Sequence, residues 1–243
     1  MIVLMTDFGI SDPYLGQVKA VLHESVPSVP IIDLLHNIPA YNIKAAAYLL
    51  PALNQSFPKE SVFLCVVDPG VGSDRLGCVA RVDDRWYVGP ENGLFDILIN
   101  HGHKVEYWHL QKAAAHIPST FHGRDIFAPV AALLADGRKP DDWQPQDLDQ
   151  LVSIYQQPDL AEIIYIDHYG NLITGLRFDS LPEGVHLRIG NKSISFAVTF
   201  SDVPKATSLA YKNSNGLLEI AINEGNAAEY FKVSVGHPIL LVV

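Results

Sequence analysis

The sequence has few cysteines, no excess of positive charge and no long apolar run. Only two of its 243 residues are cysteine, and they form no CxxC pair, so we expect reduced thiols and a cytoplasmic protein. Seventeen Lys and Arg against twenty-seven Asp and Glu give a formal charge of −10, which disfavours nucleic acid and acidic lipid as partners. The longest nearly apolar stretches, residues 45–53 and 126–135, are about half as long as a membrane span. We therefore expect no membrane segment.

Several common catalytic motifs are also missing. No Walker loop, GxSxG elbow or HExxH pair occurs. Residues 70–72 begin like a dinucleotide fingerprint, but Arg75 stands where its third glycine belongs and no helical pattern follows. Ten histidines invite a metal site, yet His101, His103 and His109 are better explained as alternating exposed positions of a strand. We expect no metal site.

The first part of the chain alternates strands with helices. The apolar patterns predict strands at 2–5, 31–34 and 62–67, helices from 15 to 26, 42–50 and 126–134, and a hairpin at 79–88 turning at Asp83 and Asp84. This order predicts a parallel sheet covered by helices on both faces. Ligands of such sheets bind at the carboxyl ends of the strands, where Asp7 and Asp68 lie.

The second part reads as strands alone. Short apolar runs separated by Gly, Asn or Pro predict a small β-barrel or sandwich, with strands at 163–166, 172–174, 185–189, 193–198, 208–211, 217–222 and 239–243. Residues 138–160 are polar and interrupted by prolines, which is typical of a linker. We thus expect an α/β domain over 1–150, with a parallel or mixed sheet, and an all-β domain over 160–243.

Three polar residues stand in loops where folding does not require them. Asp68 and Arg75 are joined through a Gly-rich loop, and His122 immediately precedes a predicted helix. Each has a plain structural explanation: Asp68 caps a turn, Arg75 pairs with it, and His122 fills a position in the core. Together they would form a proton-handling set that lacks a nucleophilic Ser or Cys.

Six ordered motifs give the chain a resemblance to a known family. They are Thr6-Asp-Phe-Gly9 with Asp12-Pro-Tyr-Leu-Gly16, Val67-Asp-Pro-Gly-Val-Gly72, Pro90-Glu-Asn-Gly-Leu94, Thr120-Phe-His-Gly-Arg-Asp125, Asp167-His-Tyr-Gly-Asn171 and Asn213-Ser-Asn-Gly216. The series closely resembles the S-adenosyl-L-methionine hydroxide adenosyltransferases, relatives of the bacterial fluorinase and chlorinase. The resemblance implies an α/β domain, a C-terminal β-barrel and a homotrimer with active sites between subunits.

The implied reaction is attack of hydroxide on the ribose C5′ of S-adenosylmethionine, releasing adenosine and L-methionine. The family's Asp, Arg and His fall on Asp68, Arg75 and His122, whereas the halogenases carry Tyr at the position of Asp68. Gly123 matches the chlorinase's small residue and not the fluorinase's Ser. The leaving thioether is neutral and needs no acid, so the enzyme must supply an aligned nucleophile and a base, Asp68 or His122. No cofactor is required.

The resemblance also assigns substrate contacts by position. They are Asp7 for the ribose hydroxyls, Asp12, Asp167 and Ser214 for the methionine ammonium, Asn171 for the adenine edge, and Tyr41 and Phe200 for its ring faces. Asn215 replaces the fluorinase's Arg, which matters only if the methionine carboxylate is bound through that side chain. For Asp7, Asp167 and Asn171 the alternative is ordinary turn chemistry at strand ends.

Two other functions stay open at this point. One is a second enzyme activity, either a chlorinase-like halogenase or a hydrolase of another adenosyl compound. The other is a non-catalytic S-adenosylmethionine sensor. Intact Asp68, Arg75 and His122 argue against the sensor, because binding alone needs no group that activates water.

Overall fold

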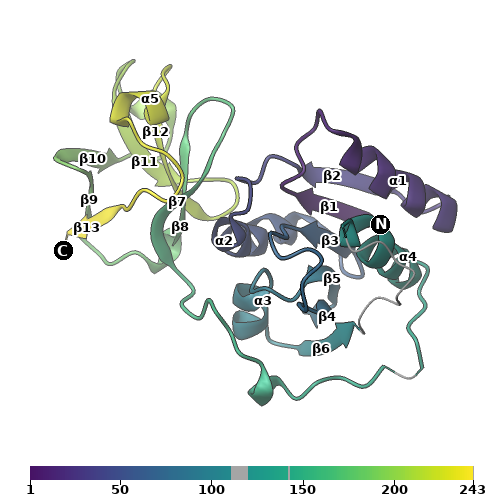
Figure 1. Ribbon diagram of the computed structural model, residues 1–243. Helices are drawn as coiled ribbons and strands as arrows, with labels where there is room; N and C mark the ends of the chain where they lie inside the picture. The colour runs from purple at the N-terminus through teal and green to yellow at the C-terminus, as the bar shows by residue number, and fades with distance from the viewer. Residues whose placement is uncertain (111–119, 142, 243) are drawn as a thin grey trace. The chain divides into compact units, whose positions relative to one another are not determined.

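The computed structural model describes residues 1–110, 120–141 and 143–242, which form two compact units (Figure 1). Unit 1 comprises Met1–Ala47 and Ser56–Gln156, and unit 2 comprises Tyr48–Gln55 and Gln157–Val243. Both units are built on a mixed sheet. No helix among the described residues is long and apolar enough to cross a membrane. Cys65 and Cys78 are buried free thiols.

Unit 1 carries a six-stranded sheet in the order β2-β1-β3-β5-β4-β6. Its elements are β1 (Ile2–Thr6), α1 (Pro13–Ser25), β2 (Ile31–Leu35), the start of α2 (Ile43–Leu53), β3 (Val62–Val66), β4 (Gly77–Val82), β5 (Arg85–Pro90), α3 (Asp96–His101), β6 (Val105–Leu110) and α4 (Ala128–Ala135). Strands β2, β1 and β3 are parallel, as the alternating pattern predicts, and β5 of the predicted hairpin also pairs parallel to β3. Strand β4 is antiparallel to both β5 and β6, which makes the sheet mixed.

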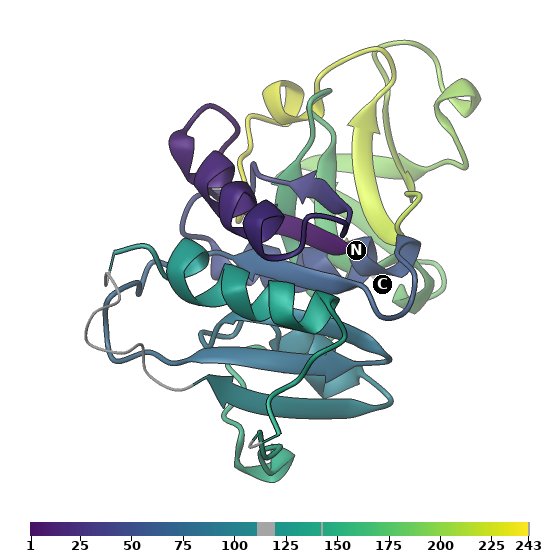
Figure 2. The ribbon, with the colours of Figure 1, turned by 90° about the vertical axis from the view of Figure 1, so that its right-hand side faces the viewer.

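The central strands of this sheet are buried on both faces, so they are continuously apolar. On one face Ile2 and Leu4 belong to a core with Val18 and Leu22 of α1 and the alanines of α4. Figure 2 shows α1 and α4 side by side in front of the strands. On the other face the rings of Phe63 and Tyr87 stack 5.1 Å apart. Because successive side chains of a strand point to opposite faces of the sheet, the same strands contribute to a hydrophobic core on each face.

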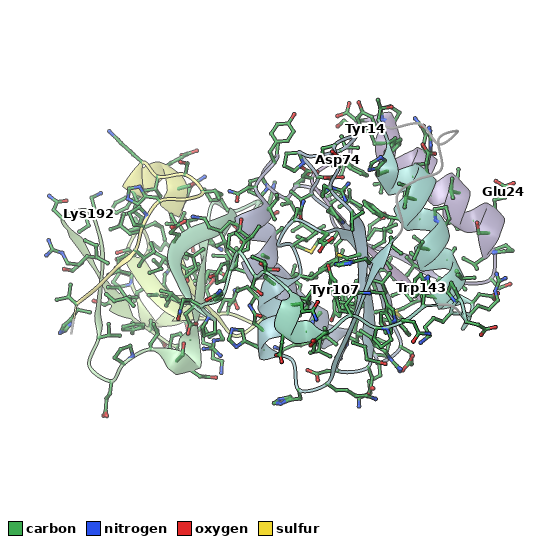
Figure 3. The ribbon with its side chains drawn as sticks, turned by 60° about the horizontal axis from the view of Figure 1, so that its bottom comes forward. Tyr14, Glu24, Asp74, Tyr107, Trp143 and Lys192 are labelled. Carbon is green, nitrogen blue, oxygen red and sulfur yellow. The ribbon has the colours of Figure 1, made fainter. Side chains whose placement is uncertain are left out.

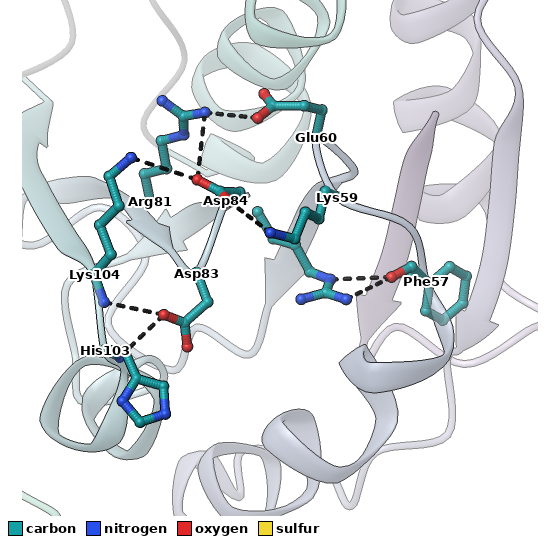
Figure 4. A network of polar contacts seen from close by, with 9 residues as sticks. Phe57, Lys59, Glu60, Arg81, Asp83, Asp84, His103 and Lys104 are labelled. Carbon is teal, nitrogen blue, oxygen red and sulfur yellow. Dashed lines mark hydrogen bonds and ion pairs between the residues drawn. The ribbon is translucent and has the colours of Figure 1, made fainter.

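The β4–β5 hairpin turns at the two aspartates that the sequence singles out. Asp83 and Asp84 have φ of 47° and 65°, the left-handed conformation that a two-residue hairpin turn requires. The Asp83 carboxylate accepts hydrogen bonds from the backbone N–H groups of His103 and Lys104, and Asp84 forms an ion pair with Lys59 (Figure 4). Side-chain bonds of this kind explain why aspartate can occupy positions that usually favour glycine.

The histidine interpretation was wrong. His101 ends helix α3, whose short span shows no clear periodicity, and His103 lies in the bend that follows. Only His109 lies on a strand, β6, where its Nε2 is 2.9 Å from Glu91 Oε1. Among the described residues, no group of three or more His, Cys, Asp or Glu is arranged to hold a metal ion.

Unit 2 carries a curled seven-stranded sheet in the order β13-β9-β10-β11-β12-β8-β7. Its elements are β7 (Leu160–Ile166), β8 (Leu172–Arg177), β9 (His186–Ile189), β10 (Lys192–Phe196), β11 (Ser208–Lys212), β12 (Leu217–Ile222), α5 (Ala227–Phe231) and β13 (Leu240–Val242). All predicted strands are present, and α5 is an addition. Ile163 N–H donates to the His237 carbonyl, and Ile239 N–H to that of Ala161 (2.9 and 2.8 Å). The segment before β13 therefore pairs with β7 at the opposite end of the sheet order.

Candidate active site

A cavity of about 380 Å³ opens in unit 1 where β1 and β3 end. These parallel neighbours pair Thr6 with Val66, so the residues that follow them, Asp7 and Asp68, reach the same edge of the sheet. The lining residues are Asp7, Phe8, Asp12, Tyr14, Ala40, Tyr41, Val66, Asp68, Val71, Thr120, Phe121, His122 and Gly123. Six predicted site residues thus share one cavity: Asp7, Asp12, Tyr41, Asp68, His122 and Gly123.

Arg75 joins Asp68 to His122. Its Nη2 lies 2.6 Å from Asp68 Oδ2 and 3.1 Å from His122 Nδ1, and its Nη1 donates to the Leu76 carbonyl. The Asp68 and Arg75 side chains are only 6% and 10% exposed. Asp68 Oδ1 is buried and accepts no hydrogen bond of good geometry from the described residues, and the nearby Gly70 N–H only opposes the rise in the pKa of this carboxyl. A buried carboxylate oxygen without a donor is energetically costly, so it marks a position for a ligand that donates a proton.

The contact with Arg75 fixes the tautomer of His122. A guanidinium only donates, so Nδ1 must accept, and the ring proton of a neutral His122 lies on Nε2. Burial and the neighbouring guanidinium lower the pKa of His122, although Asp68 and Asp125 oppose this shift. Burial raises the pKa of Asp68, against the opposing charge of Arg75. The set therefore combines a neutral imidazole donor with a carboxylate that is more basic than usual.

A chain of hydrogen bonds fixes the backbone around Asp7. Thr6 Oγ1 lies 2.8 Å from Nδ1 of the buried His36, whose Nε2 lies 3.1 Å from Asp33 Oδ1. The Phe8 N–H donates to Thr6 Oγ1. Because the Thr6 hydroxyl can accept from Phe8 and donate to His36 at once, the two loops that follow β1 and β2 are joined by side chains.

The Asp7 carboxylate is oriented by the second of these loops. Its Oδ2 accepts the Tyr41 N–H at 2.9 Å, at a residue whose φ is 63°. Burial raises the pKa of Asp7, and this hydrogen bond opposes the rise. The Tyr41 side chain is 74% exposed at the rim of the cavity. Asp12 lies at the start of α1, and its side chain forms no capping hydrogen bond, so its carboxylate is not committed to the helix.

Three aromatic rings form one wall of the cavity. Phe8, Tyr14 and Phe121 lie edge to face or tilted, with centroids 5.5 to 6.0 Å apart; Figure 3 labels Tyr14. A Cβ atom at Gly123 would lie 3.2 Å from Phe8 and 3.4 Å from Phe121. A side chain at this position would therefore crowd the wall.

The predicted site residues of unit 2 lie in two turns and at the aromatic residue Phe200. Asp167 Oδ1 accepts the backbone N–H groups of Tyr169 and Asn171, and Oδ2 accepts from the Asn171 side chain at 3.1 Å. The turn chemistry expected for this motif is therefore present. In the second turn, the N–H of Asn215 donates to Asn213 Oδ1, next to Ser214. The Phe200 ring packs against Tyr211, 5.3 Å away.

Two buried polar residues at these sites were missed in the sequence. His36 gives no signal, because only the pairing of β1 with β2 brings it to Thr6. Glu219 does give one: it is a carboxylate in the middle of an otherwise apolar run of six residues, Leu217–Ile222. A charged residue inside a buried strand is uncommon, so this position indicates a residue with a special role.

Comparison with known proteins identifies the family of this chain. The family models for the SAM hydroxide adenosyltransferase N-terminal and C-terminal domains match residues 2–144 and 161–240. An (R)-S-adenosyl-L-methionine hydrolase of Thermus thermophilus is 36% identical, over 99% of each chain. A crystal structure of an uncharacterized conserved protein from Thermotoga maritima superposes with a TM-score of 0.88 at 32% identity, covering 100% of each chain.

A fluorinase of Actinopolyspora mzabensis is more distant, at 24% identity over 97% of this chain and 95% of its own. The two-unit α/β fold and these matches thus place the chain in a group that includes both hydrolases and fluorinases. Within that group, the chain belongs to the SAM hydroxide adenosyltransferase family.

Proposed function

We propose that this protein hydrolyses S-adenosyl-L-methionine to adenosine and L-methionine by attack of hydroxide on the ribose C5′. The buried Asp68 Oδ1 that lacks a donor carries the proposal, because water can donate to it and then lose a proton. Curated relatives at 31–36% identity bear the name (R)-S-adenosyl-L-methionine hydrolase, which supports the same substrate and reaction class. No metal or organic cofactor takes part in the proposed reaction.

We assign a separate role to each member of the catalytic set. Asp68 takes the proton from water through Oδ1, since burial raises its pKa toward the working range of a general base. His122 donates from Nε2 to the water oxygen, because its Nδ1 is occupied by Arg75. Arg75 keeps Asp68 and His122 in register and balances the charge that builds on the new hydroxide.

The carboxylate of Asp68 also favours water over halide. Two like charges about 4 Å apart repel by about 4 kcal/mol at an effective dielectric near 20, equivalent to roughly a thousandfold loss of occupancy. Arg75 offsets part of this repulsion, whereas neutral water does not experience it. This repulsion makes a halogenase the second candidate function. The non-catalytic sensor comes third, because binding alone does not require a base.

The remaining site residues bind the substrate in this proposal. Their assigned partners are the ribose hydroxyls for Asp7, the ammonium for Asp12, Asp167 and Ser214, the methionine carboxylate for Asn215, and adenine for Tyr41, Asn171 and Phe200, with Gly123 leaving room at C5′. Because these residues are divided between both halves of the chain, we propose a homotrimer whose active sites lie between subunits. Residues 1–150 would form the nucleoside-binding domain, 138–160 the linker and 160–243 a small all-β barrel, in a cytoplasmic protein.

The decisive experiment is turnover of each sulfonium epimer of S-adenosylmethionine in oxygen-18 water. We expect equal amounts of adenosine and methionine, with the heavy oxygen on C5′, and inversion at that carbon when the substrate carries a stereospecific deuterium there. Molar chloride should give no appreciable 5′-chloro-5′-deoxyadenosine. A chlorinated main product would establish the halogenase instead. Unlabelled adenosine would require another hydrolytic route, and unreacted bound ligand would favour the sensor.

A further inference from the structure

Glu219 is a buried carboxylate whose hydrogen-bond partners are uncharged. It lies in β12, all six residues of which are buried, and is itself 7% exposed. The Tyr211 hydroxyl donates to its Oε1, and Asn213 Nδ2 donates to its Oε2 at 3.0 Å. None of the ion pairs formed by the described residues includes Glu219. Burying a carboxylate without a cation opposes folding, so stability does not explain this residue.

One of the two bonds shapes the turn that contains Ser214 and Asn215. Because Glu219 accepts from Nδ2, the Asn213 side chain presents Oδ1 to the turn. That oxygen accepts the N–H groups of Asn215 and Leu217, each at 3.0 Å. If the amide were reversed, its NH₂ group would face two other donors. The carboxylate therefore selects the amide orientation that the turn requires.

The other bond orients the ring next to Phe200. Tyr211 lies directly opposite Glu219 in the pairing of β11 with β12, and its hydroxyl is anchored on Oε1. The Tyr211 ring meets the Phe200 ring at 61°. Burial and the bond to Glu219 raise the pKa of Tyr211, so the hydroxyl stays protonated and continues to donate. One carboxylate thus fixes two separate parts of the unit 2 surface.

We infer that Glu219 is a positioning residue for the unit 2 half of the substrate site. Through Asn213 it sets the turn of Ser214 and Asn215, and through Tyr211 it sets the ring of Phe200. This inference rests on the proposed function, which gives those three residues to the substrate. The negative charge is needed because a carboxylate offers an acceptor to both donors. A glutamine offers one oxygen, so either the Asn213 amide faces an NH₂ group, or the Tyr211 hydroxyl must turn its proton away and accept from that group.

Glu219→Gln tests the inference by separating KM from kcat. We expect KM for S-adenosylmethionine to rise about tenfold, because one bond to a charged group is lost, while kcat stays within about twofold. Glu229→Gln, which neutralises an exposed carboxylate in α5 of the same unit, is the matched control and should leave both constants unchanged. An unchanged KM in Glu219→Gln would overturn the inference. A fall in kcat by the same factor as the rise in KM, at constant folded fraction, would also overturn it.

A second variant supplies a signature that a merely structural role would not give. Tyr211→Phe removes the hydroxyl bonded to Oε1, which is the same bond that Glu219→Gln alters, so the two changes should not be independent. The double variant should therefore raise KM by less than the product of the two single effects. Additive losses would count against the inference. If Glu219→Gln does not fold, Tyr211→Phe alone should raise KM about threefold by freeing its own ring, and no change would reject the role.

The same variants distinguish this inference from the proposed function. If the wild type releases no adenosine, the proposed function fails, and calorimetric binding of S-adenosylmethionine or adenosine then replaces KM. A wild type that releases adenosine, together with an unchanged KM in Glu219→Gln, rejects the role of Glu219 alone. Thermal unfolding of each variant gives the folded fraction by which every constant is normalised.

Discussion

Asp68 in unit 1 and Glu219 in unit 2 are both buried carboxylates, but they are satisfied in opposite ways. Asp68 has a cationic partner, Arg75, and still has an oxygen without a donor. Glu219 forms no ion pair with any of the described residues, yet neutral donors occupy both of its oxygens. The first arrangement neutralises charge and leaves one acceptor open. The second leaves the charge in place and closes both acceptors.

This difference indicates what each carboxylate can do. An open acceptor beside a guanidinium can receive a proton from a small donor, which is a chemical step. A carboxylate with both oxygens occupied can only orient the groups that donate to it. We therefore assign chemistry to the unit 1 site and substrate positioning to the Glu219 cluster, defined as Glu219, Tyr211 and Asn213. The following predictions test that division.

The largest effect should come from the set around Arg75. Asp68→Asn, Arg75→Ala and His122→Ala should each lower kcat about a hundredfold to ten-thousandfold, because each removes one positioned acid, base or charge. The three residues act as one unit, so a double variant should be little worse than its poorer single variant. Single-turnover rates at saturating substrate provide the measurement. Three singles that keep near wild-type turnover while folded would disprove the assignment.

Mixing two inactive variants should restore part of the activity, which tests whether the unit 1 and unit 2 halves of one site come from different subunits. Asp68→Asn disables the chemical half, and Asp167→Asn keeps the turn oxygen but removes the charge proposed for the ammonium. If each active site takes its halves from different subunits, random one-to-one mixing should restore about a quarter of the wild-type sites. The assay is activity after co-expression, and each variant mixed with itself is the control. No recovery, or a fully active monomer in light scattering, would contradict shared sites.

A smaller effect is expected beside the ribose-binding Asp7. Thr6→Val keeps the shape of the side chain but deprives the Phe8 N–H and His36 Nδ1 of their shared hydroxyl. We expect about a tenfold loss in kcat/KM, since buried polar groups lose their partner and the loop relaxes. Thr6→Ser retains the hydroxyl and should behave like the wild type. Equal constants for the two variants would show that the hydrogen-bond chain does not position Asp7.

Local patterns predicted much of this fold because they match its local causes. The predicted helix at 42–50 begins at Asn42, whose Oδ1 accepts the Ala45 N–H at 2.9 Å just before α2. The apolar β1 and β3 end beside the two aspartates that line the cavity. By contrast, α3 and α5, at six and five residues, are too short to show a helical period.

The parts of the site that escaped prediction depend on register between distant strands. Thr6 and His36 meet because β1 pairs with β2, and their spacing of thirty residues carries no signal. The free oxygen of Asp68 and the tautomer of His122 depend on where Arg75 places its nitrogens. A sequence can thus name the members of such a set, but the direction of each proton requires coordinates.

The pairing of residues 236–239 with β7 has a consequence for colloidal behaviour. An open strand edge displays unpaired amide groups that can recruit another chain into an aggregate. In unit 2 the β7 amide and carbonyl groups around Ile163 are already engaged, by Gly236 N–H at 2.8 Å and by the His237 carbonyl. Variants that loosen residues 236–239 should therefore aggregate before the sheet unfolds. They expose unpaired backbone groups of β7 while the hydrophobic core remains intact.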